Sequence, residues 1–405
     1  MQNPSIIKLR RPQARISNSG LDTLVQSVNK MPKMTVQCVT TLAEFESLRT
    51  EWEAIPESNP MLRWSWQRSW LTGFGSNCKL AVLVARQDDR IIGILPQVSE
   101  HHWVAGKQLI LIGSKRACSD NLSALVYPEH TTEVAIKFAD WLVDAAQRGF
   151  WNRLNYDGVR PDNIFMQSLN NAFLERGIIF ESKPSPHCWA IPLPENFEMY
   201  LKGLSKRARK LLKDLDRDFV ASQRATLKTV ITNPYAGECL AVVEQMHQRR
   251  WKGQGIQGCF SDTDFNVFLN DAVVRMCGST DEIEVSLSIV DDEPVAGAIA
   301  LRGKSEYFVY LVGMNPDAQE LRPGWLLNLQ LIHRAMQLGC TSLNLLRGDE
   351  AYKQRLGAVG FEQFRWVAVA PSWLPHIRHF IYGTGANMRH WWAKKSTTLP
   401  QLTEH

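Results

Sequence analysis

The sequence lacks any apolar stretch long enough to cross a membrane, and its cysteines follow no disulfide or metal-ligand spacing. A transmembrane helix needs about 20 mostly apolar residues. The eight cysteines are scattered singly along 405 residues, and the adjacent pair His101 and His102 is too isolated to form a metal site. These absences favour a cytoplasmic protein with reduced thiols and no resident metal ion.

The sequence also lacks surplus charge outside its first segment. The formal net charge is +5, and residues 1–33 alone carry six basic side chains against one acid. The remainder is therefore neutral, which argues against a body that binds nucleic acid. No apolar stretch follows these bases, as a secretory signal would require, so we expect a disordered basic leader over 1–33.

The apolar material is ample: 44% of the residues are hydrophobic and fourteen are tryptophan. The chain is too long for one ordinary core, so two domains are the natural expectation. Both halves show the same order of a hairpin, a third strand, a helix, a strand, a helix and a last strand. Two hairpin sequences also correspond, "RQDDRIIGIL" and "IVDDEPVAGAI". We infer an internal duplication with an α/β fold of mixed sheets.

The expected units cover residues 34–195 and 196–370, followed by a helical tail over 371–405 that docks on the second unit. Periodicity predicts helices at about 131–148, 163–176, 236–252, 262–277, 321–339 and 349–357. A bridging helix is expected over 201–219, where six basic residues precede the first acid, Asp214. Such a run is either a solvated face or a surface that holds an anionic ligand at the junction of the units.

The segment "LRPGWLLNLQLI" places a polar turn directly before a long amphipathic helix. Amides at a helix start have no partner within the helix, and the helix dipole favours negative charge there. Pro323 suits the first turn, Gly324 permits close approach of a phosphate, and Arg322 adds positive charge. The alternative is an ordinary capped helix.

A second polar cluster, "LNLLRGDEAYKQRLG", follows the next predicted strand. If strands "SEYFVYLVGM" and "TSLNLL" are parallel neighbours joined by the helix, both clusters meet at the carboxyl end of the sheet, where open sheets bind ligands. Asp349, Glu350 and Tyr352 would then lie beside whatever the turn holds.

These segments, with "RRWKGQGIQGCFSD" and the first-half segments "NPMLRWSWQRSWLTGFG" and "GSKRACSDNLSALV", resemble the GNAT acyltransferase superfamily. The sequence motifs of the C-terminal half are similar to those of the CelD/BcsL-like branch, which is associated with cellulose and exopolysaccharide production. The resemblance covers roughly residues 40–370. It implies two tandem GNAT-like units and direct transfer of an acyl group from acyl-CoA, usually acetyl-CoA, to an amine or a hydroxyl.

The resemblance also implies roles for particular residues. The coenzyme pyrophosphate would rest on Arg322, Pro323, Gly324, Trp325 and Leu326. A backbone amide at an expected bulge over Val312, Gly313 and Met314 would polarise the thioester carbonyl. Tyr352 would protonate the departing thiolate, although its spacing to Gly357 is one residue longer than in the superfamily motif. Asp349 is the candidate base, with N-capping of the next helix as the alternative role.

Further polar residues are candidates for binding the acceptor substrate. They stand in "CSDN" of the first half, in "HQRRWKG", and around the second cluster: Asp120, Asn121, His247, Arg250, Trp251, Arg347 and Glu350. Each also has an ordinary structural interpretation, as a turn residue or a core anchor. The first unit has no turn like that at 321–325, so we expect it to shape the acceptor cleft and to bind no coenzyme.

Two other functions remain open from the sequence. Tandem units of this kind also resemble the aminoacyl-tRNA-dependent peptidyltransferases of cell-wall synthesis, in which the basic helix would hold RNA. The third reading is a catalytically inactive binding or scaffold protein of polysaccharide assembly. Nothing in the residues identifies the acceptor.

Overall fold

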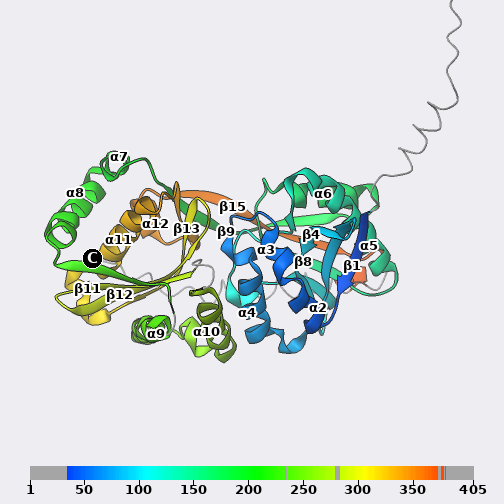
Figure 1. The fold of residues 1–405 in the computed structure, drawn as a ribbon, viewed down its shortest axis with the longest axis horizontal. Coiled ribbons are helices and arrows are strands. Elements are labelled where there is room, and N and C mark those ends of the chain that lie inside the picture. Colours follow the sequence, from blue (N-terminus) through cyan, green and yellow to red (C-terminus); the bar gives the residue numbers. More distant parts are fainter. Residues whose placement is uncertain (1–33, 233–234, 279–282, 373–374, 378, 380–405) are drawn as a thin grey trace, which may run out of the picture.

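The computed structural model describes residues 34–232, 235–278, 283–372, 375–377 and 379. The expected leader over 1–33 and nearly all of the expected tail over 371–405 lie outside these residues. Two units of similar architecture stand side by side (Figure 1). This mixed α/β arrangement confirms the predicted fold class.

The first unit contains the elements up to residue 175. Its helices are α2 (Leu42–Ser47), α3 (Arg49–Ala54), α4 (Trp64–Phe74), α5 (Thr131–Gln147) and α6 (Ile164–Glu175). Its strands are β1 (Met34–Val39), β2 (Cys78–Leu80), β3 (Val82–Gln87), β4 (Arg90–Leu95), β5 (Gln97–His102), β6 (Gly106–Leu111), β7 (Leu125–Val126) and β8 (Arg153–Val159).

The second unit repeats this order after the long strand β9 (Phe180–Pro192). Its helices are α7 (Phe197–Lys202), α8 (Lys206–Leu215), α9 (Tyr235–Gly253), α10 (Thr263–Met276), α11 (Pro323–Gln337) and α12 (Ala351–Arg355). Its strands are β10 (Ala225–Val230), β11 (Ile283–Val290), β12 (Glu293–Arg302), β13 (Glu306–Met314), β14 (Ser342–Arg347) and β15 (Val359–Val369).

The hairpins that suggested duplication have the same turn. Asp88 and Asp89 have φ of 47° and 67°, and Asp291 and Asp292 have φ of 51° and 66°. Positive φ at both central residues is the mark of a type I′ turn, which suits the twist of a two-residue hairpin and accepts aspartate more readily than most residues. The matching sequences therefore build matching structures.

The last strands of the two halves are exchanged. β9 pairs with β14 (Leu343 opposite Ile191), and β15 pairs with β8 (Trp366 opposite Tyr156). β9 and β15 also pair with each other, so an eleven-stranded sheet runs through both units in the order β10-β11-β12-β13-β14-β9-β15-β8-β6-β5-β2. Figure 1 shows β9 and β15 between the units. The division of the chain into two units at residue 195 stays a prediction, and strands from both sides of this boundary belong to the same sheet.

Helices α4 and α10 form a second junction between the units. A Cβ on Gly73 would lie 2.6 Å from the Cβ of Phe268 and 2.5 Å from the carbonyl oxygen of Asp264. The ring of Trp66 contacts those of Phe268 and Tyr310 edge to face, at 4.9 and 5.0 Å between centroids. Glycine at residue 73 therefore lets two backbones approach and brings aromatic side chains of both units together.

The predicted bridging helix over 201–219 is two helices. α7 ends at Gly203, and α8 begins after Ser205, whose hydroxyl accepts a hydrogen bond from the Ala208 amide. Glycine followed by a good N-cap stops one helix and starts the next, and it outweighs the continuous apolar stripe. α8 packs on α11, so that α11 is buried between α8 and the sheet (Figure 1).

Candidate functional site

Strands β13 and β14 separate at their carboxyl ends. They pair in parallel from Glu306 opposite Ser342 to Phe308 opposite Asn344, and both continue beyond that point without further pairing to each other. This confirms the predicted parallel neighbours joined by α11. The gap opens at the sheet end where ligands bind in open sheets.

The bulge in β13 lies at Tyr310. Val309 is opposite Ala300 and Leu311 is opposite Ile299, which leaves Tyr310 without a partner in β12. The prediction of a bulge at residues 312–314 was wrong: Val312, Gly313 and Met314 stay in register with β12. Gly313 is needed for another reason, because a Cβ there would lie 2.4 Å from the carbonyl oxygen of Val243 in α9.

The start of α11 carries the features of an anion site in part. Arg322 has φ of 51° and no side chain caps the helix. The Arg322 carbonyl accepts from the amides of Trp325 and Leu326, so these amides are not free as predicted. The Gly324 amide has no hydrogen-bond partner among the described residues, whereas Leu326 is fully buried. The accessible part of the turn is therefore Arg322 and Gly324, with Trp325 half-buried beside them.

Two of the predicted residues, Gly324 and Arg250, lie against Met314. A Cβ on Gly324 would lie 2.9 Å from the Met314 sulfur, and Arg250 of α9 lies 3.5 Å from the same sulfur through Nη1. Arg250 also acts electrostatically on Tyr352. The Met314 side chain thus covers the glycine, and it is flexible enough to move when a ligand approaches.

Tyr352 is held in its protonated form. Burial, and to a smaller extent the negative charge of Glu350, raise the pKa of its phenol to about 12, and the positive charge of Arg250 opposes this shift. A phenol with this pKa is a proton donor at neutral pH.

The second unit also matches a known protein family in sequence. Residues 202–354 match the family model described as an acetyltransferase (GNAT) domain. The second unit is a GNAT-type acyltransferase domain.

Solved structures show the same tandem fold as the whole chain. FemX has a TM-score of 0.57 at 10% identity, and the match covers 82% of this chain and 96% of FemX. A conserved protein of unknown function from Bacteroides thetaiotaomicron has a TM-score of 0.53 at 12% identity, with 83% of this chain and 100% of that one covered. At these identities the likeness shows the fold alone. No curated protein sequence matches the chain.

The turn after β14 of the GNAT-type unit is fixed by a lysine that the sequence reading did not select. Lys353 is 2% exposed, and its ammonium donates to the carbonyls of Leu346, Arg347 and Gly348 at 3.0–3.2 Å. It also pairs with Glu350 at 3.0 Å. Because the lysine follows Tyr352 directly, it fixes the backbone that places the tyrosine. Its position three residues after Glu350 was the available signal.

Asp349 and Glu350 occupy different positions from those expected for a capped helix. The N-cap of α12 is Glu350, without a side-chain capping bond. Asp349 is exposed and accepts a hydrogen bond from the Trp189 indole at 3.2 Å, with His187 at 3.6 Å. The alternative role of Asp349 as an N-cap is therefore wrong, since Glu350 holds that place.

Asp120 and Arg347 come together as a buried ion pair. The Arg347 guanidinium contacts an Asp120 oxygen at 2.5 Å, and its amide donates to the other oxygen at 3.1 Å. The Asp120 side chain is fully buried, and Asp157 lies 3.3 Å from Arg347. Asn121, with φ of 58°, completes the turn, and its carbonyl accepts from Asn59. The Asp120–Arg347 contacts join the two units.

His247 and Trp251 hold each other. The indole of Trp251 donates to Nε2 of His247 at 2.8 Å, and burial lowers the pKa of the imidazole. A neutral imidazole has one acceptor nitrogen, and here that nitrogen is occupied. His247 therefore acts as a packing residue behind Arg250.

The first unit fills the opening that corresponds to the β13–β14 gap of the GNAT-type unit. β6 and β8 pair only at Gln108–Arg153 and Leu109–Leu154 before they separate. The following loop occupies that space, with the Leu122 amide donating to the Gly158 carbonyl. Arg347 closes it from the second unit, since a Cβ on Gly158 would lie 3.0 Å from its guanidinium. That the first unit binds no coenzyme stays a prediction.

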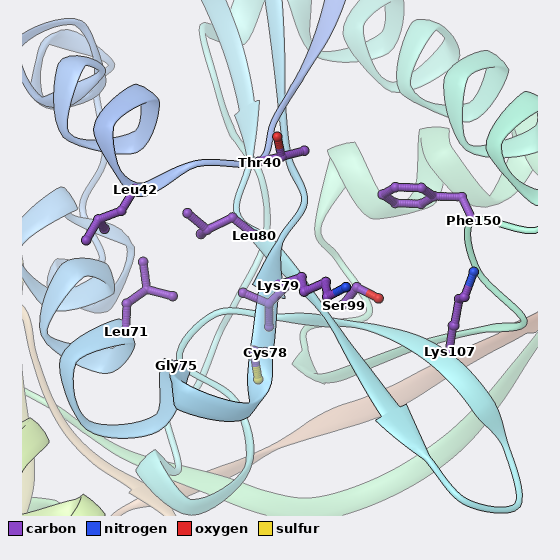
Figure 2. A pocket seen from close by; sticks show the side chains of 11 residues that line it. Thr40, Leu42, Leu71, Gly75, Cys78, Lys79, Leu80, Ser99, Lys107 and Phe150 are labelled. Carbon is purple, nitrogen blue, oxygen red and sulfur yellow. The ribbon is translucent and has the colours of Figure 1, made fainter.

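A cavity of about 570 Å³ lies in the first unit, away from this site. Figure 2 shows that it wraps around the short edge strand β2, with Leu42, Leu71 and Leu80 to one side and Phe150 and Lys107 to the other. Its lining shares no residue with the β13–β14 gap. In the part of the chain that the structure describes, no helix is long and apolar enough to cross a membrane, and no group of three His, Cys, Asp or Glu residues is placed to hold a metal ion.

Proposed function

We propose that the protein transfers an acyl group, with acetyl as the first candidate, from acyl-CoA to an amine or hydroxyl of a small polar acceptor. One observation carries the proposal: β13 and β14 separate beside the uncapped start of α11, inside the residues that match the acetyltransferase domain. The two substrates would meet directly in a ternary complex.

The residues around the turn fit the diphosphate of an acyl-CoA donor. The unpartnered Gly324 amide and the positive end of α11 favour an anion, and exposed Arg322 adds charge. Arg250 lies 3.5 Å from the Met314 sulfur through Nη1 and supplies a second cation. Pro323, Trp325 and Leu326 shape the turn and anchor it in the core.

The chemistry then divides between the strand and the tyrosine. The backbone at the Tyr310 bulge would polarise the thioester carbonyl, in place of residues 312–314. The acceptor's nitrogen or oxygen attacks that carbon and gives its proton to a base, for which exposed Asp349 is the candidate. The carbon–sulfur bond breaks, and protonated Tyr352 gives its proton to the thiolate.

For the acceptor we propose a saccharide, in cellulose or exopolysaccharide biosynthesis in the cytoplasm. The support is the resemblance of "RPGWLL" and "RGDEAYK" to the CelD/BcsL-like branch. Arg250 and Glu350 border Tyr352 and are the candidates for contacting this acceptor. An aminoacyl-tRNA donor is the alternative for the same site, and an inactive scaffold would keep the fold without turnover.

The first experiment is acetyl-CoA-dependent thermal stabilisation of the wild type and of Gly324→Glu. A carboxylate beside the turn repels a diphosphate, so the shift in Tm should be lost in the variant. Gly237→Glu, on an open face of α9 with nothing within 4 Å, is the matched control and should keep the shift. No stabilisation of the wild type at saturating acetyl-CoA would contradict the proposal.

A further inference from the structure

The outer face of α8 is a stripe of basic side chains. Lys206, Arg207, Lys210 and Lys213 are exposed, as is Lys202 at the end of α7. Within α8, Lys206, Lys210 and Lys213 are three or four residues apart and therefore lie along one side of the helix. Ala208, Leu212 and Leu215 bury the opposite side against α11.

Most of this positive charge is not neutralised by neighbours. Lys213 lies 3.7 Å from Glu198, with both side chains at least half exposed. The acids that follow, Asp214 and Asp218, are paired with Arg217. Arg209 is not part of the stripe, because its guanidinium donates to the carbonyls of Leu201, Lys202 and Leu204 and closes the end of α7.

The direction of the stripe excludes the acyl-donor site as its target. The buried side of α8 covers α11, so the lysines point away from the β13–β14 gap. The charges are therefore placed for a large partner outside the molecule.

We propose that this face docks the protein on an anionic phospholipid surface. Clusters of four to eight basic residues on an amphipathic helix suit anionic headgroups. The face is carried by the outermost helix at one end of the molecule (Figure 1), so a flat surface reaches it without rearrangement. Met199, 48% exposed on α7, lies next to the stripe and adds an apolar contact.

Phospholipid is favoured over RNA by what the face lacks. The exposed side chains of α8 include no aromatic residue on which a base would stack. Four of the five cations are lysines, which act as point charges, whereas arginine provides the forked contacts common in RNA recognition. Docking would bring the transfer site to acceptors held at a membrane surface, and it is independent of the identity of the donor.

The test is sedimentation of the full chain with vesicles of phosphatidylcholine containing phosphatidylglycerol. The variant Lys206→Gln/Lys210→Gln/Lys213→Gln keeps good helix formers and removes three charges. Each lysine near an anionic surface contributes about fivefold to partitioning, so the triple variant should bind about a hundredfold more weakly. Wild-type binding should weaken at high salt and disappear with pure phosphatidylcholine.

The control is Lys137→Gln/Lys228→Gln/Lys304→Gln, which removes three exposed lysines from other elements and should bind like the wild type. The leader is present in all three proteins, so a difference between the variants reports on α8. Equal vesicle binding by the α8 variant and the wild type would overturn the proposal. So would loss of duplex RNA binding in the α8 variant when the wild type does not bind the vesicles.

Discussion

At the scale of single residues, side chains of the second polar cluster (residues 343–357) have three different roles. Arg347 joins the units, Lys353 fixes the turn, and Tyr352, which lies near Glu350 and Arg250, is the proposed acid. The sequence predicted that Asp349, Glu350 and Tyr352 lie near the gap, because parallel strands bring their carboxyl ends together. It did not predict that Arg347 forms an ion pair with Asp120, because an ion pair between residues 227 positions apart produces no local pattern in the sequence.

Replacement of Tyr352 by phenylalanine tests the proposed acid. Turnover should fall by about a hundredfold or more, with little change in KM for acetyl-CoA, because only proton donation is lost. Burial raises the pKa of Tyr352 to about 12, so the wild-type acid stays protonated and the rate should not decline between pH 7 and pH 10 on its account. Release of free coenzyme thiol measures both effects.

The assignment would be contradicted if the wild-type rate declined between pH 8 and pH 9 and this decline were missing in Tyr352→Phe. Unchanged turnover in the variant would contradict it as well. The variant's melting temperature in the absence of ligand, compared with the wild type, separates a chemical effect from a folding defect.

At the scale of elements, hydrophobic periodicity located most of the helices but not all of their boundaries and contacts. The pattern of "LRPGWLLNLQLI" predicted α11 and its polar start, and the hairpins predicted their turns. The strand β10 was missed, and the helix over 201–219 was not divided at Gly203 and Ser205. The turn at the start of α11 was predicted only in part, because the Arg322 carbonyl accepts hydrogen bonds from two of the amides that were expected to be free.

The crossing of α4 and α10 depends on Gly73. A methyl group there would meet the backbone of Asp264 and the Cβ of Phe268 below 3 Å, so Gly73→Ala should destabilise the protein by about 1–3 kcal/mol. The control Gly237→Ala, in the open on α9, should stabilise by roughly 0.5–1 kcal/mol through lower unfolded-state entropy. Chemical denaturation followed by tryptophan fluorescence measures both; equal stability of the two variants would contradict the close approach.

At the scale of the whole molecule, exchanged strands join the units. Duplication was visible in the sequence because each half repeats its own order of elements. The strand exchange was not visible in the sequence. The alternation of apolar and polar residues within β9 and β15 determines which face of each strand is buried, but it does not identify the neighbouring strand. Since β9 lies beside β14 and β15 beside β8, each half of the eleven-stranded sheet includes a strand contributed by the other half of the chain.

Arg347 tests how much the junction contributes. Arg347→Met leaves the fully buried Asp120 carboxylate without its cation, which should cost about 3–5 kcal/mol of stability. Arg160→Met breaks a pair with Asp162 whose side chains are 38% and 64% exposed, and it should cost at most about 1 kcal/mol. Adding Asp120→Asn to Arg347→Met should recover part of the loss. A loss no greater than that of Arg160→Met in denaturant unfolding would show that the junction does not rely on this pair.

The most direct measurement is a crystal structure of the protein with acetyl-CoA. We expect the diphosphate against the Gly324 amide and Arg322, Met314 moved aside, and the thioester between the Tyr310 bulge and Tyr352. The account is contradicted if acetyl-CoA at saturating concentration leaves this corner without ligand density, or if the coenzyme lies in the first unit instead.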